Sequence, residues 1–316
     1  MTMRNLIDSY RDRVRNGEAF FMMRGKRSQR SLDAPDSNIQ TLVDGRHAVA
    51  IQVALLLEGK RKWTTVTGNP KLAKSPDRNV GITTSPADEA TPFLLGTRHE
   101  NYNACPGAVA ACIFVCVGAH TGQGRLESSK IARIGKTTAL LMYREESYAL
   151  LVAELTRHVR IAERSSVECA VRANVASDKP ARAARLARSV PGATFYDYTA
   201  IPSALNRTDR VRRTLSYKGP SNLADCLDAL ASGHPITVVA DIGADDPKPS
   251  TLWGYPAIDG DKRDEWYQLA PVPVDHAGPQ GAYVNVLYLK GNNAQKDEAR
   301  RSGFAVDLTA PLSIAA

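Results

Sequence analysis

The chain has 316 residues, a mass of 34.3 kDa and a formal net charge of +8 at pH 7. No stretch approaches the roughly 18 apolar residues that a membrane-spanning helix requires, so we expect no membrane partner. Five cysteines without a framework spacing are typical of a reducing compartment, and we expect a cytoplasmic protein rather than a disulfide scaffold.

The excess of positive charge makes a nucleotide or a nucleic acid the expected class of partner. The basic residues gather in short stretches that are dispersed along the chain, at 24–30, 60–62, 182–188 and 207–213. We predict that most of them are solvated surface with some phosphate contact. Only the fold decides whether they share one face.

We predict an N-terminal helical extension over residues 1–60 and an α/β domain over residues 61–316. Within the extension, apolar residues of 47–59 recur at helical spacing, and Gly59 is placed to end that helix. Residues 64–100 are rich in Thr, Pro, Gly and Asp, which indicates loops with short strands. The helical spacing within 130–166 predicts one long helix or two consecutive helices.

From residue 167 onward, short runs rich in Val, Thr and Tyr alternate with helical segments. The predicted strands lie in "VECAVRANV", "ATFYDYT", "RTLSYK", "PITVVAD" and "AYVNVLYLKG". The predicted helices between them are "ARAARLARSV" and "SNLADCLDALASG". This alternation predicts a parallel sheet, either open or closed into a partial or complete β/α barrel.

Three of the five cysteines stand close together in "CPGAVAACIFVC", residues 105–116. Pro106 and Gly107 start a helix well and continue one badly, which places Cys105 in a loop. Cys112 and Cys116 then lie one turn apart on the helix that follows, and Cys105 closes a triangle.

The three cysteines admit three interpretations. Three thiolates suit a [4Fe-4S] cluster whose fourth iron stays open. Zinc would need a fourth ligand, for which His99 or His120 is available. In the third interpretation the cysteines are small apolar residues on a buried helix face.

Polar residues follow the strand predicted in "VRANVASD". Arg172, Asn174, Ser177 and Asp178 would face the mouth of a barrel and contact a substrate or cofactor. The alternative is that Ser177 and Asp178 cap the next helix.

The next strand, "FYDYT", places Tyr196 and Tyr198 on one face and Asp197 on the other. The two tyrosines either line a pocket or fill the core.

Two acidic residues in "IDGDKRDEW" are secondary candidates for a polar site. The spacing of Asp259 and Asp261 departs from that of a calcium loop, and a Gly-containing turn between strands is the better interpretation. The remaining cysteines, Cys169 and Cys226, are predicted to be buried thiols.

Several motifs occur in the order found in the phage gene-product-88 family. They are "TGNPKLAKS" (67–75), the cysteine stretch, "VRANVASD" (171–178), "FYDYT" (195–199), "WGYPAIDGDKRDEW" (253–266) and "SGFAVD" (302–307). The resemblance covers roughly residues 60–307 and implies a phage protein in the host cytoplasm. It names no reaction.

A weaker resemblance is to radical-SAM-like phage proteins, which carry a similar cysteine spacing, then Asn-x-x-Ser-Asp after a strand. It implies a barrel with a [4Fe-4S] cluster held by Cys105, Cys112 and Cys116, and S-adenosylmethionine contacted by Asn174, Ser177 and Asp178. Arg172, Tyr196, Tyr198, Asp259 and Asp261 would then contact the substrate. This chain has one more residue between its last two cysteines than that family, and Ala200 and Ile201 replace its basic pair.

We therefore expect a radical-SAM-like iron–sulfur protein acting on a nucleotide or nucleic acid, with enzymatic activity left open. The alternative is a non-catalytic module, stabilised by zinc or free of metal, that binds nucleic acid or a host protein.

Overall fold

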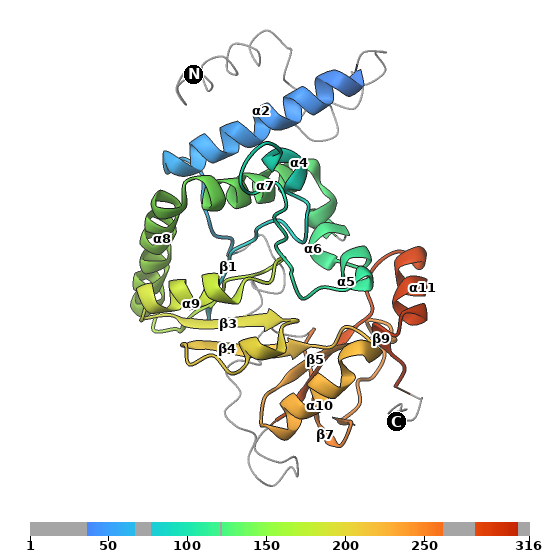
Figure 1. The fold of residues 1–316 in the computed structure, drawn as a ribbon. Coiled ribbons are helices and arrows are strands. Elements are labelled where there is room, and N and C mark those ends of the chain that lie inside the picture. Colours follow the sequence, from blue (N-terminus) through green and yellow to red (C-terminus); the bar gives the residue numbers. More distant parts are fainter. Residues whose placement is uncertain (1–36, 67–76, 121, 262–281, 309–316) are drawn as a thin grey trace.

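The computed structural model describes residues 37–66, 77–120, 122–261 and 282–308, which Figure 1 shows as coloured ribbon. The α-helices are α2 (Ser37–Leu57), α4 (Thr91–Leu94), α5 (Ala110–Phe114), α6 (Val117–His120), α7 (Glu127–Met142), α8 (Arg144–Arg164), α9 (Pro180–Ser189), α10 (Leu223–Ala231) and α11 (Asn293–Arg301). Short 3₁₀ helices are η2 (Gly122–Arg125), η3 (Pro202–Ala204) and η4 (Pro220–Asn222).

The strands are β1 (Arg78–Gly81), β2 (Cys169–Arg172), β3 (Thr194–Thr199), β4 (Val211–Ser216), β5 (Ile236–Ala240), β6 (Thr251–Leu252), β7 (Tyr255–Asp259), β8 (Val284–Tyr288) and β9 (Ala305–Val306). They form one sheet in the order β1-β2-β3-β4-β5-β8-β7-β6, with β9 beside β5. Every pairing is parallel except that of β6 with β7. The described strands form an open sheet, so the predicted mostly parallel α/β architecture is confirmed.

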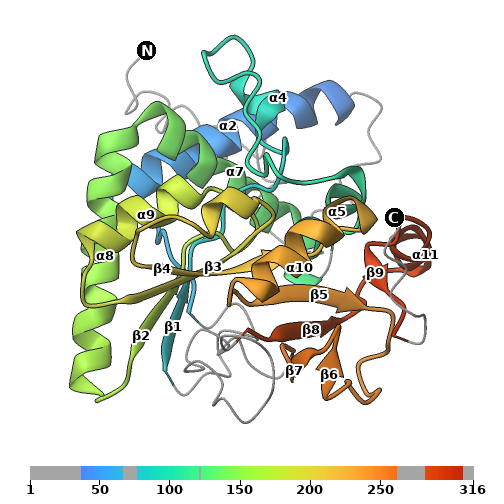
Figure 2. The same cartoon turned by 60° about the horizontal axis from the view of Figure 1, so that its bottom comes forward.

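Parallel neighbours need crossover connections, and helices supply them here. Figure 2 shows α8, α9 and α10 on the same side of the sheet. Leu186 of α9 and Leu230 of α10 are fully buried there. The strands beneath are short and mostly buried, as is typical of a sheet covered by helices.

The predicted helix near residues 47–59 is present as α2, which begins earlier, at Ser37. Gly59, with φ of 69°, follows its carboxyl end in the left-handed region. Ala48, Val53 and Leu56 belong to the main hydrophobic core, so the later part of the predicted extension shares that core. Residues 1–36 lie outside the described residues.

The long helical stretch is two consecutive helices, α7 and α8, which meet at Tyr143. Ser147 Oγ of α8 donates a hydrogen bond of 2.9 Å to the Ala139 carbonyl of α7, which fixes the junction. No described helix is both long and apolar enough to cross a membrane.

One part of the cysteine prediction is wrong. A single helix does not carry both Cys112 and Cys116, because α5 ends at Phe114 and α6 starts at Val117. Val115, with ψ of 12°, separates the two helices, and it packs into a small core with Leu289 and Ala299. Burial of Val115 therefore favours an interruption between α5 and α6. The spacing of the cysteines in the sequence gives no sign of this interruption.

Candidate functional site

The cysteine segment, residues 103–118, lies across the carboxyl ends of neighbouring parallel strands. Two glycines allow its backbone to approach the loops that follow β2 and β3. A Cβ on Gly107 would lie 3.0 Å from the Ala200 carbonyl oxygen after β3. A Cβ on Gly118 would lie 2.6 Å from the Ala176 Cβ after β2, closer than real Cβ contacts. At Gly118 only glycine fits without a displacement, and at Gly107 a larger residue would make a tight contact.

Hydrogen bonds hold the same segment from several sides. Lys218, which follows β4, donates to the Gly107 carbonyl at 2.8 Å and to the Ala200 carbonyl at 3.2 Å. The Asp178 amide donates to the Ala104 carbonyl at 2.9 Å. The segment is thus tied to the ends of β2, β3 and β4, the edge where open α/β sheets bind their ligands.

The loop after β1 supplies a direct contact to a thiol. The Ala87 amide donates to Cys105 Sγ at 3.3 Å, and Cys105 Sγ lies 3.9 Å from the Ala176 carbonyl. Burial raises the pKa of the Cys105 thiol to about 11, while the amides of Ala87 and Asp178 act in the opposite direction. Amide donors aimed at sulfur are typical of thiols that become thiolates when a metal binds.

The thiols of Cys112 and Cys116 resemble that of Cys105 in their raised pKa. Burial raises the pKa of both Cys112 and Cys116, and the amides of Gly118 and Ala119 partly offset this at Cys116. The charge of Cys116 raises the pKa of Cys105 and of Cys112 as well. At neutral pH the three thiols are protonated, and a bound metal would have to displace those protons.

Within the described residues, no group of three or more His, Cys, Asp or Glu side chains could hold a metal ion as placed. His99 instead accepts a hydrogen bond from Arg98 Nε at 3.1 Å, and His120 is exposed. The ligand sulfurs of a four-iron cluster stand farther apart than those of a single zinc ion, because each cysteine binds a different iron.

A buried polar network lies beneath the cysteine segment, between the sheet and α9. Its centre is Arg182, whose guanidinium donates to Thr84 Oγ1 at 3.0 Å, to Ser177 Oγ at 2.6 Å and to Asn174 Oδ1. Asn174 Nδ2 in turn donates to Asp197 Oδ2 and to the Lys179 carbonyl. The Asn174 amide is therefore fully engaged within the protein, where it holds the loop after β2.

Asp178 lies beside this network and faces the cysteine segment. Its Oδ2 accepts from the Ala200 amide at 2.8 Å and from Thr199 Oγ1 at 3.2 Å. Its Oδ1 is buried without a hydrogen-bond partner among the described residues. Burial raises the pKa of Asp178, and its charge also raises that of Cys105. Among Asn174, Ser177 and Asp178, Asp178 therefore has an acceptor atom beside Cys105 that no described residue uses.

The family assignment follows from the extent of the match. The model of the family described as Gene product 88 matches residues 55–306, which include every element from the end of α2 to β9. The chain belongs to the gene product 88 family. Comparisons with curated proteins and with solved structures gave no match.

The two tyrosines of this gene product 88 chain lie on one face of β3, with Asp197 on the other. Tyr196 is fully buried and donates to Asn79 Oδ1 of β1 at 2.9 Å. Tyr198 is partly exposed, its ring lies 4.2 Å from the guanidinium carbon of Arg172, and its hydroxyl accepts from Asn285 at 3.3 Å. Tyr196 thus fills the sheet face, while Arg172 and Tyr198 form a stacked pair.

Asp259 and Asp261 form an ion-pair cluster at the carboxyl end of β7. Lys248 Nζ lies 2.7 Å from Asp259 Oδ1 and 3.4 Å from Asp261 Oδ2. Asp261 also pairs with Lys290 at 2.8 Å and accepts from the Tyr288 amide. Both carboxylates thus tie the end of β7 to β8 and to the loop that carries Lys248.

Sequence reasoning missed two buried arginines near the site. Arg182 belongs to a stretch predicted as mostly solvated, yet it is only 7% exposed. Arg133 of α7 is 4% exposed and pairs with Glu89 in the loop after β1, and both charges act on Cys116. The burial of Arg182 could have been inferred from its position two residues after Pro180, on the same face of α9 as its apolar residues. The thiols Cys169 and Cys226 are buried, as predicted.

Proposed function

We propose that this protein is a radical-SAM-like iron–sulfur protein, with a [4Fe-4S] cluster held by Cys105, Cys112 and Cys116. The observation that carries the proposal is that the segment with these three cysteines lies across the carboxyl ends of the parallel strands. In a reduced state, such a cluster supplies one electron for cleavage of S-adenosylmethionine to methionine and a 5′-deoxyadenosyl radical.

The donor set supports a cluster in two ways. Cys105 lies in the preceding loop, Cys112 on α5 and Cys116 between α5 and α6, and backbone amides approach the sulfurs of Cys105 and Cys116. The second support is Asp178, whose Oδ1 has no hydrogen-bond partner in the described part of the chain and provides an acceptor for the amino group of a cofactor bound beside Cys105. Asn174 and Ser177 position the Asp178 loop through Arg182.

The parallel strands support the finer proposal of a barrel-like arrangement, with the cluster loop at the mouth. A nucleotide or nucleic acid is the proposed substrate class. Its support is the net charge of +8 together with the Arg172–Tyr198 pair on the sheet face that carries Tyr196, which offers a cationic and an aromatic surface to a base.

The test is purification of the full chain without oxygen, followed by iron, sulfide and zinc analysis and an absorbance spectrum. The proposal predicts about four irons and four sulfides per chain. Cys112→Ser should lose most of this iron. The matched control is Cys226→Ala, which removes a buried thiol in α10 outside the segment and should retain the iron.

About one equivalent of zinc without sulfide would instead favour the zinc-stabilised binding module and overturn the proposal. With a cluster present, incubation with S-adenosylmethionine and dithionite should yield 5′-deoxyadenosine. An intact cluster that produces none would remove the enzymatic part of the proposal and leave an iron–sulfur protein.

A further inference from the structure

A second region with binding potential lies at the opposite edge of the sheet. A hollow of about 350 Å³ opens between the end of α2, residues 59–63 and α8. It reaches Arg78, the first residue of β1, so it lies at the amino edge, away from the cysteine segment. Its volume falls within the range of roughly 300–1,000 Å³ that small-molecule sites occupy.

The inner wall of this hollow is apolar and includes an indole. Leu56, Leu150 and Ile161 contribute aliphatic surface. Trp63 also lines the hollow and is 1% exposed, and its Nε1–H has no hydrogen-bond partner among the described residues. Because this N–H is itself buried, Trp63 contributes apolar bulk behind the wall rather than a hydrogen bond to a ligand.

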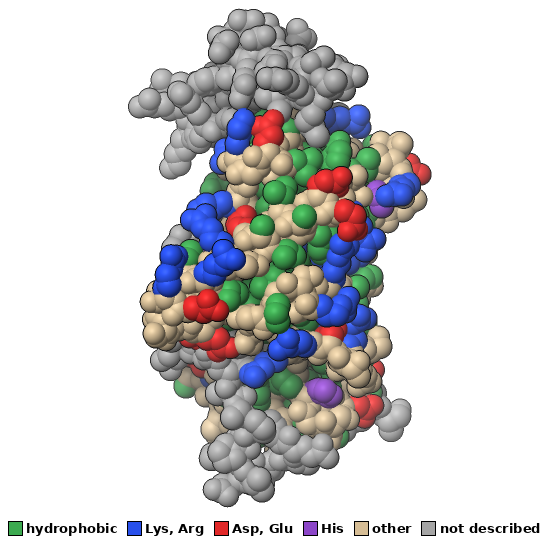
Figure 3. All heavy atoms as spheres, turned by 90° about the vertical axis from the view of Figure 1, so that its left-hand side faces the viewer, with side chains coloured by type: hydrophobic (Ala, Val, Ile, Leu, Met, Phe, Trp, Pro, Cys, Tyr) green, Lys and Arg blue, Asp and Glu red, His purple; other side chains and the backbone are tan. Residues whose placement is uncertain are grey.

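Four cationic side chains line the same hollow: Arg61, Lys62, Arg78 and Arg157. Their charges converge. After burial, the charges of Arg78, Arg157 and Lys62 contribute to lowering the pKa of His158, to about 4. Figure 3 shows the side of the molecule that carries α8, where groups of Lys and Arg lie between apolar side chains.

The single carboxylate among the described lining residues is already engaged. Glu154 accepts from the Trp63 amide at 2.9 Å, from the Thr64 amide at 3.0 Å and from Thr64 Oγ1. His158 is neutral, and its Nδ1 accepts from Arg78 Nε at 2.9 Å. The hollow therefore presents an excess of positive charge above an apolar floor.

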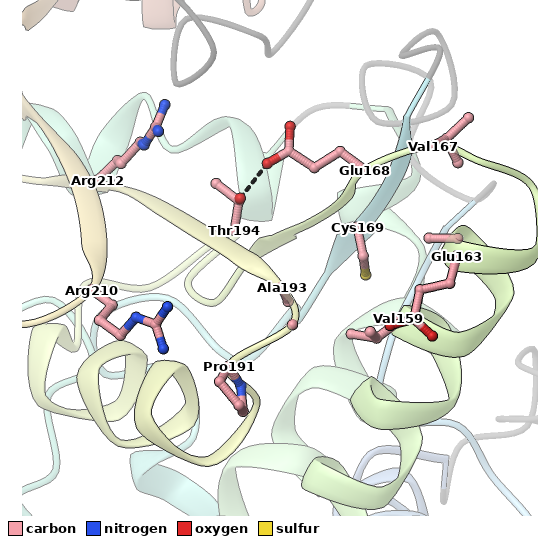
Figure 4. Close-up of a pocket in the computed structure, with 12 residues that line it drawn as sticks. Val159, Glu163, Val167, Glu168, Cys169, Pro191, Ala193, Thr194, Arg210 and Arg212 are labelled. Carbon is pink, nitrogen blue, oxygen red and sulfur yellow. Dashed lines mark hydrogen bonds between the residues drawn. The ribbon is translucent and has the colours of Figure 1, made fainter.

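A second hollow, also about 350 Å³, lies on the other side of α8, and its charges are mixed (Figure 4). Arg210 and Arg212 stand opposite Glu163 and Glu168, and Glu168 accepts a hydrogen bond from Thr194. Carboxylates facing the arginines reduce the attraction for an anion, so this hollow is less suited to bind one.

We propose that the hollow lined by Trp63 and Arg157 binds a nucleoside monophosphate, with its planar base on the apolar wall and its phosphate among the four cations. Cations beside an apolar wall suit a small anion with an aromatic body. A phosphate makes charge-assisted hydrogen bonds to arginine, and the base supplies acceptors and a flat apolar surface. The site is separate from the cysteine segment and does not depend on a cluster.

The experiment is isothermal titration of the purified full chain with AMP, UMP, adenosine and inorganic phosphate. Arg157→Gln should weaken mononucleotide binding roughly tenfold, which corresponds to one lost charge-assisted hydrogen bond. The matched control is Arg160→Gln, an exposed arginine on the same helix that does not line the hollow, and it should bind as the wild type does. Both side chains are exposed, so neither substitution should impair folding.

Arg61→Gln removes a second exposed cation that lines the hollow, and it should also weaken binding severalfold. Equal affinity for adenosine and AMP would overturn the role of the cations, and equal affinity for phosphate and AMP would overturn the role of the base. Absence of binding, or equal losses in Arg157→Gln and Arg160→Gln, would overturn the site. Cys112→Ser should leave this binding unchanged, so failure here is distinguishable from failure of the cluster proposal.

Discussion

The two edges of the parallel sheet are built from different interactions. At the carboxyl edge, the cysteine segment makes close backbone approaches at Gly107 and Gly118, and a buried network around Arg182 holds the loop after β2. At the amino edge, the exposed Arg61, Lys62 and Arg157 and the half-buried Arg78 surround a hollow with an apolar wall. Substitutions at the carboxyl edge should therefore change stability, whereas exposed substitutions at the amino edge should change ligand binding alone.

The largest expected effect is at the centre of the buried network. Arg182→Met leaves Thr84, Asn174 and Ser177 without their cationic donor and should cost about 3–5 kcal/mol in the free energy of unfolding. Arg188→Met, on the exposed side of the same helix, should change it by less than about 0.5 kcal/mol. Urea titration of both variants gives the comparison. Equal losses of unfolding free energy in the two variants would mean that the buried network does not stabilise the carboxyl edge.

The next effect concerns the reactivity of the thiols. The pKa of Cys105 is raised by burial from 9.0 to about 11, so its thiolate fraction near pH 8 should be roughly a hundredfold below that of a free thiol. Alkylation of the metal-free protein by iodoacetamide, followed by peptide mass spectrometry, should accelerate continuously up to pH 10. The urea-unfolded chain serves as the control, and a native rate that levels off below pH 9 would contradict the prediction.

A smaller effect is expected from the close approach at Gly118. Gly118→Ala places a methyl group against Ala176 and should cost about 1–3 kcal/mol, because the cysteine segment must move away from the loop after β2. Ala110→Ser, at the exposed start of α5, is the control. Thermal unfolding measures both variants, and an unchanged midpoint for Gly118→Ala would show that the segment is not held there.

The smallest effect is a pH dependence at the amino edge. Burial, and then the charge of Arg78, lower the pKa of His158 from 6.5 to about 4. The unfolded chain takes up this proton more readily, so the stability contributed by neutral His158 is present above pH 6.5 and is lost as the pH falls toward 4. With screening, the loss should be on the order of 1–2 kcal/mol.

This dependence can be isolated with His158→Gln, which has no group titrating in that range. Chemical unfolding at pH 7 and at pH 4.5 should show a smaller fall for the variant than for the wild type. An equal fall in both proteins would assign the acid sensitivity to other groups.

Much of the carboxyl edge could be predicted from local pattern. The strand that ends in Arg172, the alternation of Tyr196, Asp197 and Tyr198, and a loop position for Cys105 follow from side-chain periodicity and from Pro106. These features depend on residues close in the chain. The break at Val115 could not be predicted, because it depends on packing against Leu289 and Ala299 from the far end of the chain.

The sequence by itself determined the family, the alternation of strands and helices and the gathering of three cysteines on one short segment. Only the tertiary structure decided that Arg182 is buried while Arg188 is exposed, and that Lys62, Arg78 and Arg157 meet around one hollow. The physical reason is that burial and electrostatic convergence depend on neighbours distant in sequence. Local periodicity, by contrast, is set by backbone geometry alone.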